Sequence, residues 1–88
     1  MTNPVRRKQA RRAMLEALSH AGSYALPEQV MLEFVNDLIK PPLSFGEQGV
    51  TLAFLRDQQF IRLVPDSLDP EMKQWIITEL GKNFLASL

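Results

Sequence analysis

The sequence predicts one small, mostly helical α+β domain, in which three helices precede a two-stranded β-hairpin and a short closing helix. As far as about residue 58, apolar residues recur at helical spacing between recognisable helix starts and stops. From residue 60, two short segments rich in β-branched and aromatic residues replace that pattern. The chain has 88 residues, of which 45% are apolar. This length provides one small core and no room for a second domain.

The first helix is expected to run from Pro4 to about His20. Asn3 is a favourable N-cap, and proline is well suited to the first helical position. Gly22 is placed to end the helix, and His20 in the last turn complements the helix dipole. The apolar stripe of this helix consists of Ala10, Met14, Leu18 and Ala21.

The charge of the chain is unevenly distributed, although its formal net charge is zero. The first twelve residues carry five cations and no anion: Arg6, Arg7, Lys8, Arg11 and Arg12. Residues 13–88 carry a net charge of minus five. Towards the N-terminus, the positions on the same side of the first helix are occupied by Arg7 and Arg11 instead of apolar residues. The first two turns of this helix are therefore not expected to lie on the core. We therefore distinguish a basic helical arm, residues 1–12, from the main domain, residues 13–88. Such a cluster attracts phosphate, or it is a solvated helix end.

A second helix opens at Leu26-Pro27-Glu28, with Pro27 at its first position and Glu28 in the first turn. It ends before Pro41-Pro42, because proline disfavours a helical conformation in the residue before it. Its wide apolar stripe predicts the most deeply buried helix of the domain. The stripe contains Leu26, Val30, Met31, Phe34, Val35, Leu38 and Ile39.

A third helix is expected to extend from Phe45 to about Gln58. The sequence Ser44-Phe45-Gly46-Glu47 is a capping box, in which the serine and glutamate side chains bond each other's backbone amides. Phe45, Leu52 and Leu55 are expected to face the core. Gln48 falls on the same face and is an unusual residue there.

The hairpin is predicted at residues 60–64 and 73–78, joined by the turn-rich segment 65–72. Trp75 lies in the second strand and is expected to pack towards the first helix. Thr78-Glu79 then caps the closing helix. The apolar stripe of that helix is Leu80, Phe84, Leu85 and Leu88.

Two motifs carry a resemblance to a known superfamily. The pattern Ser44-x-x-Glu47-x4-Leu52-x2-Leu55-x4-Phe60-Ile61 resembles the third helix and first wing strand of winged helix-turn-helix domains. The sequence Trp75-Ile76-Ile77-Thr78-Glu79-x-Gly81 resembles their W-x-x-T-x-x-G ending. The likeness implies that the hairpin is the wing and that the third helix is the one that enters the major groove in DNA-binding members.

More narrowly, the chain resembles small winged-helix proteins of Mu-like prophages. This likeness rests on segments 12–18 and 34–38, Pro41-Pro42, and the wing sequence Asp66-x-Leu68-Asp69-Pro70-Glu71. It implies a phage-type protein with a role in transcription regulation and brings no established activity. Two positions depart from the superfamily pattern. Gln48 stands where leucine is usual, and Gln59 stands where glycine is usual. Gln59 is therefore expected either to adopt a left-handed conformation or to be accommodated by a different turn.

If the third helix buries the residues expected above, its outward face has no basic residue and two acidic ones. The outward residues are Gly46, Glu47, Gly49, Val50, Ala53, Phe54 and Asp57. Base reading needs arginine, lysine, asparagine or glutamine, so this face is poorly suited to read DNA by itself. The first hypothesis is therefore an accessory or regulatory DNA-binding protein whose arm holds phosphates of double-stranded DNA. The arm alone gives a log–log salt slope of at most about −4.5. The predicted DNA contacts are Arg6, Arg7, Lys8, Arg11, Arg12, Arg56, Arg62 and Lys73.

The alternative hypothesis is a protein-interaction domain, either a homodimer or an adaptor in a phage-type assembly. Val50, Ala53 and Phe54 form a small apolar patch on the third helix. Leu88, in the last turn, either packs on its own core or pairs across a two-fold axis. The simpler reading is that the first helix or the wing covers this patch.

Other function classes find little support in the composition. The chain has no cysteine and one histidine, and no spacing typical of a metal site or a catalytic triad appears. We therefore expect a non-enzymatic protein without a cofactor or small-molecule ligand. No apolar run approaches the roughly 20 residues of a membrane span, and no signal-peptide pattern opens the chain. The expected location is the cytoplasm.

Overall fold

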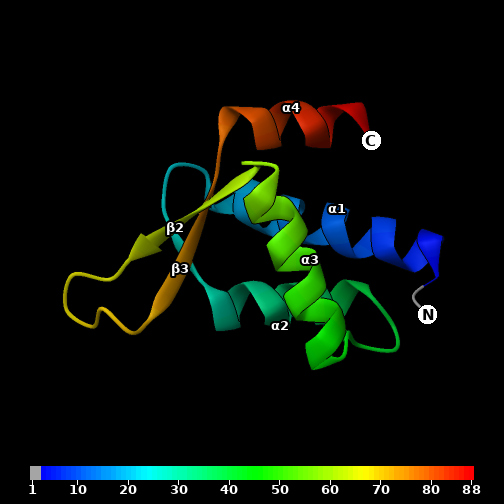
Figure 1. The fold of residues 1–88 in the computed structure, drawn as a ribbon, viewed down its shortest axis with the longest axis horizontal. Coiled ribbons are helices and arrows are strands. Elements are labelled where there is room, and N and C mark those ends of the chain that lie inside the picture. The colour runs from blue at the N-terminus through cyan, green and yellow to red at the C-terminus, as the bar shows by residue number, and fades with distance from the viewer. Residues whose placement is uncertain (1–2) are drawn as a thin grey trace.

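The computed structural model describes residues 3–88 and contains, within them, four helices and a small antiparallel sheet (Figure 1). The elements in chain order are α1 (Pro4–Ala21), β1 (Leu26–Pro27), α2 (Glu28–Leu38), α3 (Phe45–Asp57), β2 (Ile61–Pro65), β3 (Lys73–Ile77) and α4 (Glu79–Ser87). The predicted mostly helical α+β fold is confirmed. Each helix lies close to its predicted range.

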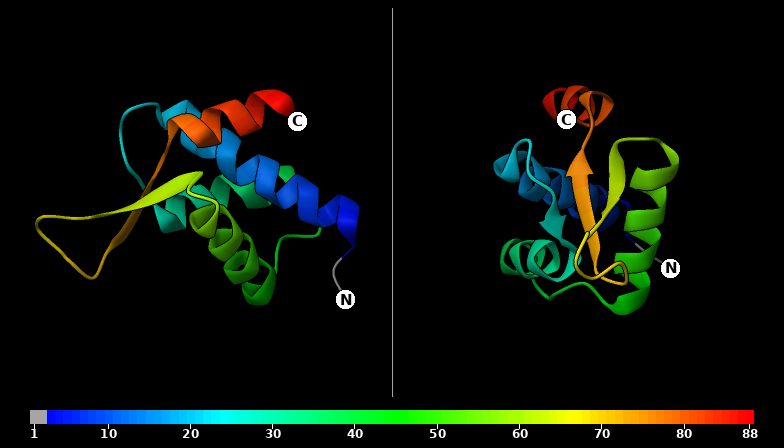
Figure 2. Two further views of the ribbon diagram at one scale, coloured as in Figure 1. Left: turned by 45° about the horizontal axis from the view of Figure 1, so that its top comes forward. Right: turned by 90° about the vertical axis from the view of Figure 1, so that its left-hand side faces the viewer.

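The first helix occupies the centre of the molecule. It packs against α2, α3, α4 and β3, with α2 on one side and α4 on the other (Figures 1 and 2). Its buried residues are Ala10, Ala13, Met14, Leu15, Ala17 and Leu18. The prediction that α2 is the most buried helix is wrong, because Val30 and Leu38 of α2 are 47% and 55% exposed. Within its bounds α2 buries Met31 and Val35, whereas α1 buries six residues.

The predicted helix caps form as the sequence indicates. The Asn3 side chain accepts a hydrogen bond from the Val5 amide at 2.8 Å. Gly22 ends α1 with a φ of 65°, a conformation that favours glycine. Ser44 and Glu47 make both hydrogen bonds of the capping box at the start of α3. These local patterns therefore set the boundaries of two helices.

The hairpin is confirmed, and the sheet gains one strand that was not predicted. Ile61 pairs with Ile77 and Pro65 with Lys73, so β2 and β3 are antiparallel throughout. On the other side of β3, Leu26 pairs with Trp75, which gives the strand order β1-β3-β2. Pro27 belongs to β1 and caps α2, rather than being its first helical residue. Proline is acceptable there because β1 is an edge strand.

The closing helix is tied to the end of α3 by Thr78. Its hydroxyl donates to the Gln59 carbonyl at 2.6 Å and accepts from the Gly81 amide at 3.1 Å. Gln59 has a φ of 64°, which confirms the first of the two conformations expected for it. A Cβ at Gly81 would overlap the Phe60 carbonyl oxygen. This position therefore requires glycine, because α4 approaches the start of β2 so closely.

Trp75 is buried, with 5% of its surface exposed, and its indole N–H donates to the Glu28 carboxylate at 3.0 Å. Trp75 is therefore part of the hydrophobic core. In α4, Phe84 and Leu85 pack against the core, while Leu80 is 53% exposed and departs from the predicted stripe. None of the helices in residues 3–88 combines the length and the apolar character needed to cross a lipid bilayer.

Candidate nucleic-acid interface

Arg6, in the first turn of α1, contacts the N-terminus of α3. The Arg6 guanidinium donates to both carboxylate oxygens of Glu47, at 2.7 and 3.2 Å. It also donates to the carbonyls of Pro41 and Pro42, which lie in the turn before α3. The hydrogen bonds from Arg6 and from the Ser44 amide lower the pKa of Glu47 to about 2. Glu47 is therefore ionised and paired, rather than a free acidic group on this helix.

The exposed face of α3 differs from the expected one at two aromatic residues. Phe45 was expected to face the core, but 91% of its surface is exposed. Phe54 was expected to point outwards, but it packs partly buried against the core, with its ring edge against Phe60. The inward positions of α3 include Thr51 and Leu55. Phe45 instead lines a surface groove.

A groove separates α3 from β3 and the start of α2. Phe45, Gly49, Ala53 and Arg56 line its α3 side, and Lys73 of β3 lies across from them. Glu28 also lines the groove, where its carboxylate accepts the Trp75 hydrogen bond. Gln48, which the sequence left unexplained, donates to the Leu43 carbonyl at 3.2 Å. Gln48 therefore helps to hold the turn before α3.

The predicted basic arm is the first part of a continuous helix, since α1 runs from Pro4 to Ala21 without a break. The boundary between residues 12 and 13 falls inside it. Arg6 is engaged with Glu47, and Arg12 donates to Glu16 at 3.0 Å on the exposed surface. Arg7 and Lys8 are exposed. Figure 1 shows this end of α1 extending away from the wing.

Arg11 lies over the ring of Phe54, with its guanidinium carbon 3.5 Å from the ring centroid. Its Nε is buried and has no hydrogen-bond partner among the described residues. Burial, with the nearby charge of Arg7, lowers the pKa of Arg11. The cation–π contact compensates for part of the lost hydration. Arg11 thus covers Phe54, which agrees with the simpler reading that the first helix covers part of the apolar patch.

The wing has exposed cations on its strands and an acidic loop whose carboxylates accept hydrogen bonds from backbone amides of the same loop. Arg62 and Lys73 are exposed on β2 and β3. In the connecting loop, the Asp66 carboxylate accepts from the amides of Leu68 and Asp69 at 2.7 and 3.2 Å. These contacts make Asp66 a turn-forming group. Leu68, at 95% exposure, is presented to solvent by this turn.

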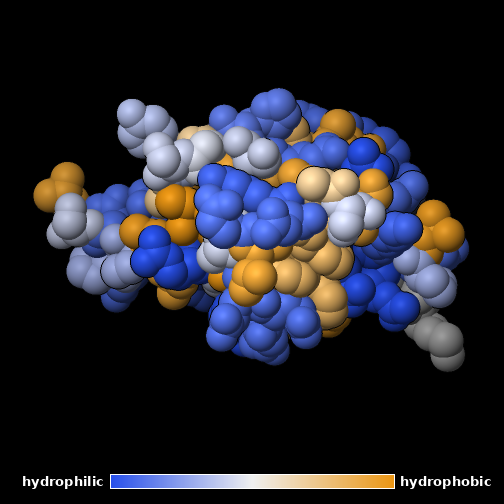
Figure 3. Space-filling model, turned by 90° about the horizontal axis from the view of Figure 1, so that it is seen from above, coloured by the Kyte–Doolittle hydropathy of each residue, from blue (hydrophilic) through white to orange (hydrophobic). Residues whose placement is uncertain are grey.

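The remaining interface candidates are distributed over α3 and α4. Val50 is 62% exposed, Ala53 is partly buried, and Leu88 is half-buried at the chain end. Viewed from the α4 side, hydrophobic surface appears only as small patches among hydrophilic residues (Figure 3). The protein-contact roles predicted for these residues stay predictions.

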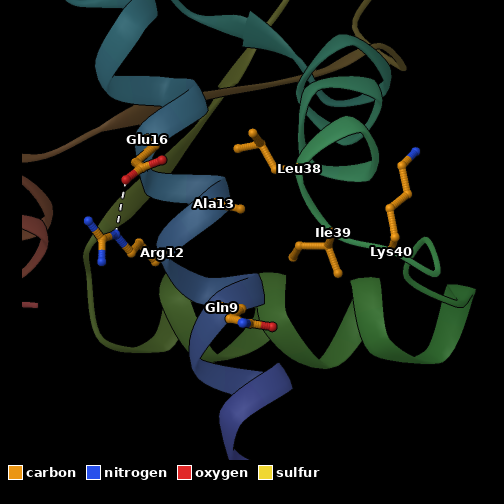
Figure 4. A pocket seen from close by; sticks show the side chains of 7 residues that line it. All are labelled: Gln9, Arg12, Ala13, Glu16, Leu38, Ile39 and Lys40. Atoms are coloured by element: carbon orange, nitrogen blue, oxygen red, sulfur yellow. Dashed lines mark hydrogen bonds and ion pairs between the residues drawn. The ribbon is translucent and has the colours of Figure 1, made fainter.

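A second depression lies between α1 and the end of α2, and Figure 4 shows the residues around it. Leu38 and Ile39 lie between the two helices, while Arg12 and Glu16 pair with each other along α1 (Figure 4). No group of three or more histidine, cysteine or acidic residues suited to a metal ion occurs in residues 3–88.

Comparison with known proteins gives matches at the level of structure. No protein-family model matches the sequence, and no curated protein matches it either. The chain is similar to the PcaV transcriptional regulator from Streptomyces coelicolor, with a TM-score of 0.70 and 19% identity over 98% of this chain and 51% of that one. It is also similar to the adhesin competence repressor AdcR from Streptococcus pyogenes, with a TM-score of 0.69 and 18% identity over 89% of this chain and 50% of that one.

A third similar structure is F-93 of SSV1, with a TM-score of 0.64 and 21% identity. That match covers 88% of this chain and 79% of F-93. The chain spans about half the length of PcaV and AdcR, so the likeness concerns one part of those proteins. Together with the order of helices and the β2–β3 wing, these likenesses show that the chain has a winged-helix fold.

Proposed function

We propose that this protein is an accessory or regulatory DNA-binding module that contacts duplex DNA with α3 and the wing. The observation that carries the proposal is the placement of cations on both sides of the exposed face of α3. Lys73 and Arg56 line the groove on the wing side, and Arg7 lies beside Val50 on the α1 side. A helix with cations on both of its sides suits the major groove, which two phosphate backbones border.

The acidic residues of α3 weigh less against this proposal than their number implies. Glu47 is paired with Arg6, and Asp57 lies 3.4 Å from the Arg56 guanidinium. Each of these two carboxylates has a cationic partner within the chain, so its repulsion of phosphate is reduced.

The cations of the first helix contribute fewer phosphate contacts than their number implies. Arg6 and Arg11 have partners within the fold and Arg12 pairs with Glu16, which leaves Arg7 and Lys8 as the arm residues best placed for phosphate. With Arg56, Arg62 and Lys73, these make five contacts and a log–log salt slope of about −4.5. The prophage context implied by the sequence resemblance remains part of the proposal, as does transcription regulation.

The experiment is a fluorescence-anisotropy titration of a labelled duplex at several salt concentrations. The R56A/K73A double variant should reduce the magnitude of the salt slope by about 1.8, or 0.9 for each cation removed. The matched K40A/K82A variant removes two exposed lysines that do not line the groove, and it should leave the slope unchanged. Equal slopes for the two double variants would refute the proposed surface.

A protein-interaction role is the second candidate, because Phe45 and Val50 leave apolar surface exposed on the same helix. Sedimentation of the protein over a range of concentrations distinguishes the two roles. Self-association that F45A or V50A abolishes, without any binding of duplex DNA, would favour this second candidate.

A further inference from the structure

The exposure of Phe45 has no explanation within the fold. Phe45 is the first residue of α3, and 91% of its surface is exposed. The capping box that begins this helix uses the side chains of Ser44 and Glu47, and the core is completed by Leu55 and other residues. An aromatic side chain of this size, exposed where neither cap nor core requires it, is available for a binding contact.

The helix surface beside Phe45 is open to close approach. A Cβ at Gly49 would meet no atom within 4 Å, and a Cβ at Gly46 would meet only the Ser44 hydroxyl at 3.9 Å. Packing therefore requires neither glycine, although a glycine inside a helix costs about 1 kcal/mol relative to alanine. A binding partner that contacts Phe45 can therefore also approach the backbone of α3 closely.

The groove that Phe45 lines holds two cations and one carboxylate, Glu28, which already accepts the Trp75 hydrogen bond, so the charges beside Phe45 favour an anionic occupant. Arg56 and Lys73 share its groove, and Arg7 lies on the opposite side of α3. A ligand that fits this arrangement has anionic edges and an apolar group between them. The major groove of duplex DNA has this chemistry, because phosphates border it and the C5-methyl group of thymine projects into it.

We propose that Phe45 is a specificity-determining residue that packs on thymine methyl groups in the major groove. This inference rests on the proposed function and adds a sequence preference to it. Phe45 would supply the preference through apolar contact, and the neighbouring cations would supply affinity that is independent of sequence. Burial of one methyl group corresponds to about a four-fold change in affinity.

The test removes the methyl group from the DNA and leaves the protein intact. A short alternating dA–dT duplex presents thymine methyls in every register, and the matching dA–dU duplex lacks only those methyls. The wild-type protein should bind the dA–dT duplex about four-fold more tightly for each methyl contacted. The F45A variant should bind the two duplexes equally. L68A is the matched control, since Leu68 is 95% exposed on the acidic wing loop, and it should keep the wild-type preference.

The outcomes separate this inference from the proposed function. Equal binding of both duplexes by the wild-type protein would overturn the role of Phe45 and leave DNA binding standing. Binding of neither duplex would overturn both. Loss of self-association in F45A, with the thymine preference unchanged, would assign Phe45 to a protein contact and overturn the inference as well.

Discussion

Arg6, near the start of α1, holds the Glu47 carboxylate of α3 with two hydrogen bonds, at 2.7 and 3.2 Å. The same glutamate closes the capping box by accepting from the Ser44 amide at 3.0 Å. One guanidinium therefore connects the first helix to the N-terminus of the helix that we propose to enter DNA. The arginine fixes α3 through these contacts.

The first prediction concerns this connection. R6A should lower the urea midpoint of unfolding, because it frees Glu47 and leaves the Pro41 and Pro42 carbonyls without their donor. R7A should change the midpoint much less, since Arg7 is exposed. Urea denaturation followed by circular dichroism measures both variants. Similar midpoints for R6A and R7A would mean that the Arg6 contacts add no stability.

The second prediction follows from the pKa of Glu47, which falls from 4.5 to about 2 in the folded chain. The unfolded chain therefore takes up a proton at higher pH than the folded one. The stability that this pairing provides is complete above pH 4.5 and is lost as the pH falls towards 2. E47Q should show a flatter dependence of unfolding free energy on pH across this window. A curve parallel to that of the wild type would contradict the prediction.

The third prediction concerns Gln59, whose φ of 64° lies in the left-handed region. Q59G should stabilise the protein by about 0.5–1 kcal/mol, because relief of backbone strain outweighs the added freedom of the unfolded chain. Q58G is the matched control. Gln58 has a φ of −81°, so glycine there relieves no strain and should lower stability. Thermal unfolding of the two variants gives the comparison.

The sequence predicts best those features that depend on neighbouring residues. The caps at Asn3, Ser44 and Thr78 involve partners within three positions, so the local pattern contains the whole interaction. The left-handed conformation of Gln59 was one of two alternatives expected from the superfamily resemblance, in which glycine is usual at this position.

Features that depend on distant residues could not be predicted in the same way. Arg6 and Glu47 are 41 positions apart, and nothing in the charge pattern selects this pair. Leu26 and Pro27 form too short a strand to show an alternating pattern, so their pairing with β3 had no signal. Phe45 shares a helical stripe with Leu52, so periodicity places it on the core face, although 91% of its surface is exposed.

The fourth prediction compares two glycines with opposite surroundings. At Gly81 an added Cβ would overlap the Phe60 carbonyl and lie 2.8 Å from Ile77. G81A should therefore destabilise the protein by about 3 kcal/mol or more, or prevent folding. At Gly49 nothing lies within 4 Å, so G49A should stabilise α3 by about 1 kcal/mol. Chemical denaturation measures the unfolding free energy of both variants. Similar changes in the two would show that local packing does not decide the effect of an added Cβ.

The last prediction assigns the exposed cations of α1 a role in binding rather than in stability. Arg7 and Lys8 are exposed, while Arg6 is bonded within the fold. R7A/K8A should keep the wild-type unfolding midpoint and reduce the magnitude of the salt slope for duplex DNA by about 1.8. Deletion of residues 1–12 is a poorer test, because it also removes Arg6 and the buried Ala10. If R7A/K8A gives the slope of the K40A/K82A control, then α1 does not contact phosphate, and the positive charge that binds DNA lies on α3 and the wing.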